Sequence, residues 1–265
     1  FPLVYATLSL SLHIPLMVVL IGIVLRGTAF TFRYYDVSPD KTHKYFTSFF
    51  EISSFITPFF LGITLGAMIL GDIPPDNAGS FSERFILPWF NLFCFVIVLF
   101  TIAIFGYIAA VFLTSEAKNT PEQRKYSRLS KIFLSSTFAM GLLVFLSAEY
   151  NNRHLLADFF GSVLCIISFS LVILLIPVIF YLVNHPKTIY LRIAIGAQVA
   201  LIIFGWFAMQ FPVIIFEKGG THLTFYNTQA PYATLYQLFI ALIVGLILIV
   251  PCFYFLFKVF KGSDE

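Results

Sequence analysis

Three charged side chains lie close to the ends of long apolar runs, where a charge needs a partner. Arg26 closes the first apolar run, Gly27 follows it, and Arg33 comes after five further residues. Glu51 lies near the start of the next run. A charge at such a depth is costly unless it reaches water, a lipid phosphate or an opposite charge. We therefore expect Arg26, Glu51 and Arg33 either to form a structural ion pair or to belong to a proton path, and for Arg26 alone the alternative is a membrane-surface anchor.

Other candidate residues are one histidine and several aromatics. His13 lies about halfway along the first apolar run. A haem ligand is conceivable there, but with no second ligand nearby a polar lining group that bonds a neighbouring helix is favoured. Trp206, Tyr226 and Tyr232 border the last long polar segment, either as an interfacial aromatic belt or as contacts to a lipid. The cysteines stand alone, so we expect no metal site and no catalytic residue.

The composition identifies the elements that carry these residues. The chain has 265 residues, of which 59% are hydrophobic and only 11% are charged, and its mean hydropathy is +0.92. Soluble domains are about one-quarter charged, and apolar runs of about 20 residues are long enough to cross a bilayer as helices. We therefore predict an all-α integral membrane protein with a single transmembrane domain. The net charge of +3 gives no indication of nucleic-acid binding, because the basic residues lie between the runs.

Seven membrane spans are predicted, and Gly62 and Gly66 in the second of them permit close helix packing. The spans cover about 3–25, 46–70, 85–113, 132–148, 156–183, 189–209 and 234–257.

Lysine and arginine counts predict the orientation. The segments after the first, third and fifth spans and the C-terminal tail hold four, five, two and two when Arg192, at the start of the sixth span, is counted with the fifth connection, whereas each of the other connections holds one. By the positive-inside rule the first set is cytoplasmic, and so is the C-terminus. The first span would then enter from outside, and we expect a further N-terminal helix that is missing here.

Two blocks of sequence resemble the subunit II family of cytochrome bd-type quinol oxidases. One is Leu25-Arg26-Gly27-Thr28-Ala29-Phe30-Thr31-Phe32-Arg33, similar to the arginine-bearing end of that family's second helix. The other runs from Trp206 through Met209-Gln210-Phe211-Pro212 and Leu223-Thr224-Phe225-Tyr226-Asn227 to Ala230-Pro231-Tyr232-Ala233-Thr234-Leu235. It resembles the family's last extracytoplasmic loop. Pro251 near the chain end and the Phe1-Pro2-x-x-Tyr5 opening are also similar.

The resemblance implies a fold and a role. The fold would be eight helices in two four-helix bundles, of which seven are present. The complex would be a terminal oxidase of a bacterial or archaeal cytoplasmic membrane that oxidises quinol, reduces dioxygen to water and generates proton motive force. Haem b and haem d would belong to subunit I, the partner in a heterodimer that small single-helix subunits can join. This chain would scaffold subunit I, line oxygen or proton paths, and contact lipid or a structural quinone through Trp206, Tyr226 and Tyr232.

Two other functions are kept as alternatives. Prolines interrupt several spans, as in secondary transporters, but the middle of the membrane lacks the acidic residues that such a transporter needs. The second alternative is a non-catalytic assembly partner of another haem-containing membrane protein. A reduced-minus-oxidised spectrum of the purified complex distinguishes an oxidase from a transporter, because a transporter shows no b or d haem bands.

Overall fold

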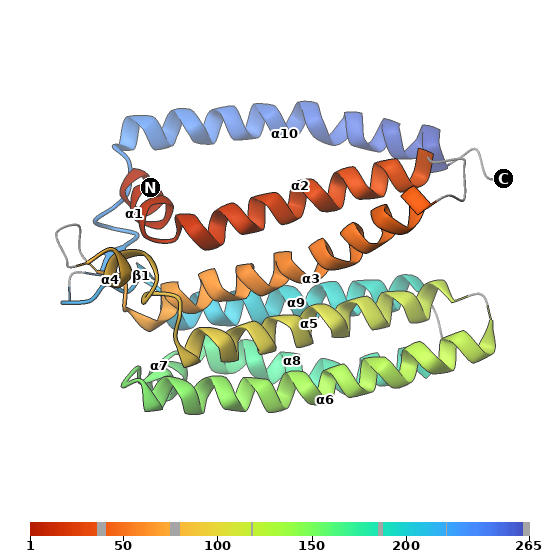
Figure 1. The fold of residues 1–265 in the computed structure, drawn as a ribbon, viewed down its shortest axis with the longest axis horizontal. Coiled ribbons are helices and arrows are strands. Elements are labelled where there is room, and N and C mark those ends of the chain that lie inside the picture. The colour runs from red at the N-terminus through yellow and green to blue at the C-terminus, as the bar shows by residue number, and fades with distance from the viewer. Residues whose placement is uncertain (36–40, 75–79, 118, 185–187, 221, 262–265) are drawn as a thin grey trace.

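The structure is a computed structural model that describes residues 1–35, 41–74, 80–117, 119–184, 188–220 and 222–261. These residues form helices and one small antiparallel sheet (Figure 1). The helices are α1 (Pro2–Ser11), α2 (His13–Tyr35), α3 (Lys41–Leu70), α4 (Phe81–Phe85), α5 (Leu92–Glu116), α6 (Thr120–Tyr150), α7 (Leu155–Gly161), α8 (Val163–Asn184), α9 (Thr188–Gln210) and α10 (Tyr232–Lys261). The strands are β1 (Val213–Ile215) and β2 (Leu223–Thr224).

Seven of these helices are long and apolar enough to cross a membrane, which confirms the all-α membrane fold. They are α2, α3, α5, α6, α8, α9 and α10, and they run side by side (Figure 1). The short elements α1, α4, α7 and the sheet gather at one end, which we call the capped end. At the opposite end α2, α5 and α8 end and α3, α6 and α9 begin, and we call it the basic end.

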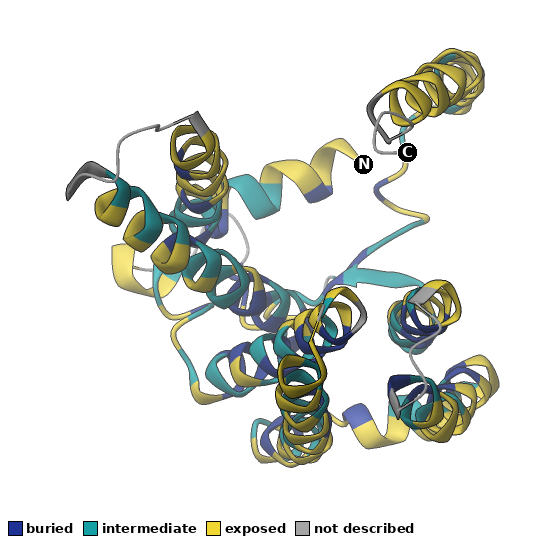
Figure 2. Ribbon diagram, turned by 90° about the vertical axis from the view of Figure 1, so that its right-hand side faces the viewer, coloured by how far each residue is buried: buried dark blue, intermediate teal, exposed yellow. Residues whose placement is uncertain are grey.

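Helix packing is uneven across the molecule. Along the chain, α2 packs on α3, α3 on α5, α5 on α6, and α8 on α9. A buried apolar cluster joins four of these helices through Val111 of α5, Leu134 of α6, Ile179 of α8 and Leu191 of α9. By contrast, α10 stands apart from the other helices (Figure 2).

Two glycines set the distance between α3 and α5. A Cβ added at Gly62 would lie 2.9 Å from the Val98 Cα atom, and one at Gly66 would lie 2.8 Å from the Cys94 Cα atom. Only glycine allows backbones to approach so closely. This geometry confirms the expectation that Gly62 and Gly66 serve close helix packing.

Buried hydrogen bonds join α5 to the neighbouring helices α8 and α9. Tyr107 of α5 donates a hydrogen bond to the Gln198 side chain of α9 at 3.0 Å, and Gln198 donates to the Val172 carbonyl of α8 at 3.4 Å. Tyr107 and Gln198 are buried. These hydrogen bonds offset the cost of burying the polar side chains of Tyr107 and Gln198 in an apolar layer.

The structure corrects three predicted span boundaries. The first span is not one helix over 3–25, because the chain breaks at Leu12 between α1 and α2, and α1 lies across the capped end (Figure 2). Pro15 explains the break, since it lacks an N–H and its ring opposes the carbonyl four residues before it. The fifth span is likewise divided, where Ser162 separates α7 from α8 and its hydroxyl accepts the Cys165 amide hydrogen.

The third correction concerns the fourth span. The basic segment before residue 132 was predicted as a connection, but most of it is the first part of α6. Asn119 and Pro121 begin this helix in positions that suit an N-cap and a first turn. The basic side chains therefore stand on a rigid helix. Lys118 and Lys187, which entered the predicted charge count, lie outside the described residues.

Candidate functional site

Arg26, Arg33 and Glu51 occupy the neighbouring helices α2 and α3 toward the basic end, and all three are exposed. The Arg26 guanidinium lies over the Phe50 ring, 5.5 Å from its centroid. Among the described residues no ion pair joins Glu51 to Arg26, Arg33 or Lys44. The predicted ion pair and proton path remain predictions, and a carboxylate from outside this set has free access to Arg26.

His13 lies at the start of α2, rather than midway along a span as its place in the sequence indicated. Its Nδ1 atom is 2.9 Å from the Leu10 carbonyl oxygen, and its ring meets Phe85 edge-on with centroids 5.0 Å apart. These contacts tie the α1–α2 break to α4. They give His13 a local structural role at the capped end.

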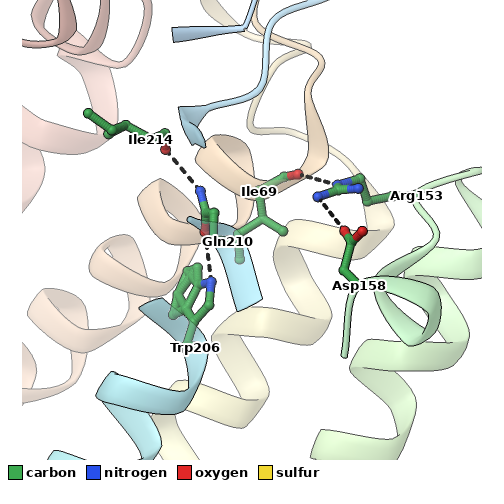
Figure 3. Close-up of polar contacts among 6 residues, drawn as sticks. All are labelled: Ile69, Arg153, Asp158, Trp206, Gln210 and Ile214. Atoms are coloured by element: carbon green, nitrogen blue, oxygen red, sulfur yellow. Dashed lines mark hydrogen bonds and ion pairs between the residues drawn. The ribbon is translucent and has the colours of Figure 1, made fainter. Parts of the chain in front are cut away.

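Trp206 anchors the segment that leads from α9 toward α10 (Figure 3). Its indole N–H donates a hydrogen bond to the Gln210 side chain at 2.7 Å. The Gln210 amide in turn donates to the Ile214 carbonyl at 2.9 Å. Trp206 also packs on the buried cluster that contains Ile69 and Phe93. It thus faces the interior of the capped end, while its predicted contact with quinone or lipid stays a prediction.

Arg153 makes polar contacts with two different segments of the capped end (Figure 3). Its Nε atom donates to the Ile69 carbonyl at 3.2 Å, and its Nη2 atom lies 2.9 Å from the Asp158 carboxylate. The guanidinium carbon is 3.8 Å from the centroid of the Phe216 ring. Arg153 therefore ties α3, α7 and the segment after β1 together. Only its charge next to Asp158 was visible in the sequence.

The aromatic residues of the last long connection form a surface cluster at the capped end. Phe225 lies within ring-contact distance of Phe1, Phe207 and Phe211, and Tyr226 meets Phe211 edge-on at 6.0 Å. Tyr226 is 66% exposed.

Tyr232 lies at the first turn of α10, where its ring stacks on that of Tyr236 with centroids 6.3 Å apart. It is 81% exposed. Tyr226 and Tyr232 are thus accessible to a membrane ligand or to another chain.

Helix α10 is accessible on all sides within the described chain. None of the residues in its most apolar window is buried, whereas 39% of the corresponding window of α5 is buried. Gly245 and Cys252 lie on the same side of α10, since seven residues complete almost two turns. A Cβ added at Gly245 meets nothing within 4 Å, and Cys252 is exposed beside a shallow hollow next to Pro251.

The described residues contain no group of three or more histidine, cysteine or acidic side chains that could hold a metal ion. The Nδ1 atom of His13 is engaged by the Leu10 carbonyl oxygen and its ring packs against Phe85, so its described contacts are structural ones.

This arrangement of seven spanning helices with one unpacked helix defines a polytopic α-helical membrane protein. The family model for cytochrome bd terminal oxidase subunit II matches residues 1–260, and the chain belongs to that family. The family resemblance seen in the sequence is thereby confirmed. A comparison with curated proteins gives no match.

The fold is similar to that of a chain in the structure of bd oxidase from Geobacillus thermodenitrificans. The TM-score is 0.70 at 20% sequence identity, and the match covers 95% of this chain and 74% of that one. This likeness supports the predicted fold of helical bundles.

Proposed function

We propose that this chain is the scaffold subunit of a quinol:oxygen oxidoreductase, and that a haem-bearing subunit I docks on α10 and the outer face of α2. In this proposal the partner's haems b and d carry the reaction, and the complex oxidises quinol, reduces dioxygen to water and builds a proton gradient. The basic end faces the cytoplasm, in line with its lysines and arginines. The membership of the cytochrome bd subunit II family supports this assignment.

The observation that carries the proposal is the isolation of α10. A helix of 30 residues with no buried residue in its apolar window gains little from packing in this chain alone. Lipid can cover an apolar helix. Because α10 lies at a distance from the other helices of this chain, however, both α10 and the outer face of α2 remain open to another chain. Ala241 and Gly245 are spaced by one turn, and small residues at this spacing let a second helix approach closely.

Arg26 supplies a polar contact for the same partner. It lies about 20 Å along α2 from His13, inside a hydrocarbon layer of about 30 Å that begins near that residue. A guanidinium exposed at this depth is stabilised by a carboxylate. Within the described residues its contact is the Phe50 ring. A carboxylate of the partner subunit is the group that best satisfies it, and Glu51 and Arg33 extend this polar strip toward the basic end.

Copurification tests the docking face. Gly245→Leu adds a side chain where the chain has open space, so it leaves the isolated fold intact and obstructs only an approaching partner. We expect the yield of copurified b and d haem bands, read from a reduced-minus-oxidised spectrum, to fall at least tenfold, or about 1.4 kcal/mol in association. Gly196→Leu, on α9, is the matched control, because a Cβ added at this helix glycine likewise meets nothing within 4 Å.

Undiminished haem bands with Gly245→Leu would contradict docking on this side of α10. A wild-type preparation that contains no haem partner would instead contradict the oxidase assignment itself. Tyr226 and Tyr232 remain proposed contacts of a quinone tail or a lipid, supported by their exposure at the capped end.

A further inference from the structure

Three basic side chains near the start of α6 have no partner in the part of the chain that the structure describes. Arg124, Lys125 and Arg128 are all exposed, and neither an ion pair nor a hydrogen bond reaches their side chains there. Elsewhere the arginines at subdomain junctions are neutralised, since Arg153 pairs with Asp158 and Arg192 pairs with Glu116. Arg124, Lys125 and Arg128 differ from these two arginines in that no acidic side chain of the described chain neutralises them.

Their spacing places like charges next to one another on α6. Arg124 and Arg128 are one helical turn apart, and Lys125 and Arg128 are three residues apart, so like charges share one face. Glu122 stands three residues before Lys125, but it forms no ion pair among the described residues. Glu116, at the end of α5, is engaged by Arg192. An external anion seated among the three cations would relieve this repulsion.

About one turn further along α6, the same face becomes apolar. A shallow hollow is lined by Arg124, Lys125, Arg128, Leu129 and Ile132. Helix α6 has 31 residues, so it is about 46 Å long and exceeds a hydrocarbon layer of about 30 Å. The cationic groups lie on its projecting part, and Leu129 and Ile132 lead toward the apolar layer. A charged rim above an aliphatic floor matches the headgroup and the first acyl carbons of a phospholipid.

We propose that Arg124, Lys125 and Arg128 bind the headgroup of an anionic phospholipid, whose acyl chain lies along Leu129 and Ile132. The aliphatic floor favours a lipid over a free phosphate ion, and three cations favour an anionic over a zwitterionic headgroup. This surface lies on the opposite side of the molecule from α10 (Figure 1). The site therefore stays open when another chain covers α10, and it does not depend on the docking proposal.

Photocrosslinking tests this site locally. The full chain, as purified with any copurifying subunits, is mixed with photoactivatable phosphatidylglycerol or with phosphatidylcholine of the same acyl chains. Crosslinked peptides are then quantified by mass spectrometry. We expect phosphatidylglycerol adducts to concentrate within residues 124–139 and to exceed phosphatidylcholine adducts there.

Substitutions then test the charge contribution. Each basic residue near a lipid headgroup is worth about fivefold in affinity, so Arg124→Gln with Arg128→Gln should weaken apparent binding about 25-fold. Both side chains are exposed, so the helix tolerates the change. Arg124→Lys with Arg128→Lys should restore most of the crosslinking. Lys258→Gln, another exposed basic residue at the basic end, is the control and should leave it unchanged.

Three results would overturn the proposal. They are crosslinking that the double glutamine variant leaves unchanged, equal labelling by phosphatidylcholine, and displacement of the lipid by inorganic phosphate, which would indicate a simple anion site. If no haem-bearing partner copurifies with the chain, the expected lipid crosslinking stays the same.

Discussion

Helices α5 and α10 have the same apolar character and opposite environments. Each has a mean hydropathy of 2.8 over its most apolar window, yet 39% of that window is buried for α5 and none for α10. Helix α5 contacts α3 and α6 and reaches α8 and α9, whereas α10 stands apart from the other helices (Figure 2). Hydropathy therefore specifies that both helices enter a membrane, but it does not specify what they pack against.

The difference lies in the small residues and polar pairs that face each helix. Helix α5 meets the glycine surface of α3 at Gly62 and Gly66, and Tyr107 connects it to Gln198 of α9. Helix α10 has its own small residue, Gly245, but nothing in the described chain approaches it. Since lipid is as apolar as leucine, close packing and hydrogen bonds decide helix association. The docking partner proposed for α10 would supply what α3 supplies to α5.

The largest predicted effect disrupts the close packing of α3 on α5. Gly66→Ala places a Cβ 2.8 Å from the Cys94 Cα atom, so α3 and α5 must separate. We expect a loss of about 1–3 kcal/mol in the free energy of unfolding, because overpacking forces backbone shifts. Equilibrium unfolding in detergent measures it. Gly245→Ala is the matched control and should be neutral or slightly stabilising, since alanine favours a helix; an equal loss for both variants would refute the distinction.

A smaller effect concerns the segment that positions α10. Arg153→Leu removes the Asp158 ion pair, the hydrogen bond to Ile69 and the stacking on Phe216. We expect a loss of about 1–2 kcal/mol, near the low end for charge-assisted bonds because Asp158 is partly exposed to solvent.

Hydrogen exchange locates the effect of this variant. The Phe216 and Lys218 amides, which donate to the Met68 and Ile73 carbonyls, should exchange faster. The amides of α5 should keep their protection. Faster exchange spread evenly over both regions would show that Arg153 supports the whole fold rather than the capped end.

The smallest predicted effect is a pH dependence at the capped end. Partial burial raises the pKa of the Asp72 carboxyl above its usual value of 3.8, and the Lys218 ammonium lowers it in part. The folded chain thus binds the proton more tightly than the unfolded chain. The resulting stabilisation is complete below pH 3.8 and is lost as the pH rises through the folded pKa.

Asp72→Asn should therefore gain stability relative to the wild type as the pH rises from 4 toward 7. Because Asp72 is only partly buried and keeps more than about a third of its surface exposed, the gain should stay within about 0.5 kcal/mol. Unfolding curves at several pH values measure the difference. A wild type that instead gains on the variant with rising pH would show that Lys218 outweighs burial.

The fold class, the seven spans and the family could be predicted from the sequence because long apolar runs and two local motifs encode them directly. Helix ends could not, because hydropathy reports a run and not its breaks. Pro15 and Ser162 divide two of the runs, and Asn119 with Pro121 starts α6 before its apolar part. The cap signals at Asn119 were present in the sequence, although the basic residues that follow them indicated a loop.

The candidate site was less predictable, because its contacts join segments that are distant in the chain. Arg153 meets a carbonyl 84 residues away, at Ile69, and no local pattern encodes that distance. Arg26 could be recognised as a charge in need of a partner, but its contact with Phe50 depends on how α2 and α3 pack. The isolation of α10 has no sequence signal at all, since its hydropathy equals that of α5.

The most direct test of the central claim, that another subunit covers α10, uses the natural Cys252. Cys94 and Cys165 are buried, and Cys252 is exposed on the same side of α10 as Gly245. In the complex purified with its haem-bearing partner, N-ethylmaleimide should label Cys252 at least tenfold more slowly than in the separated chain. A cysteine introduced by Ser135→Cys on α6 should react equally in both. Equal labelling of Cys252 in the two preparations would contradict docking on α10.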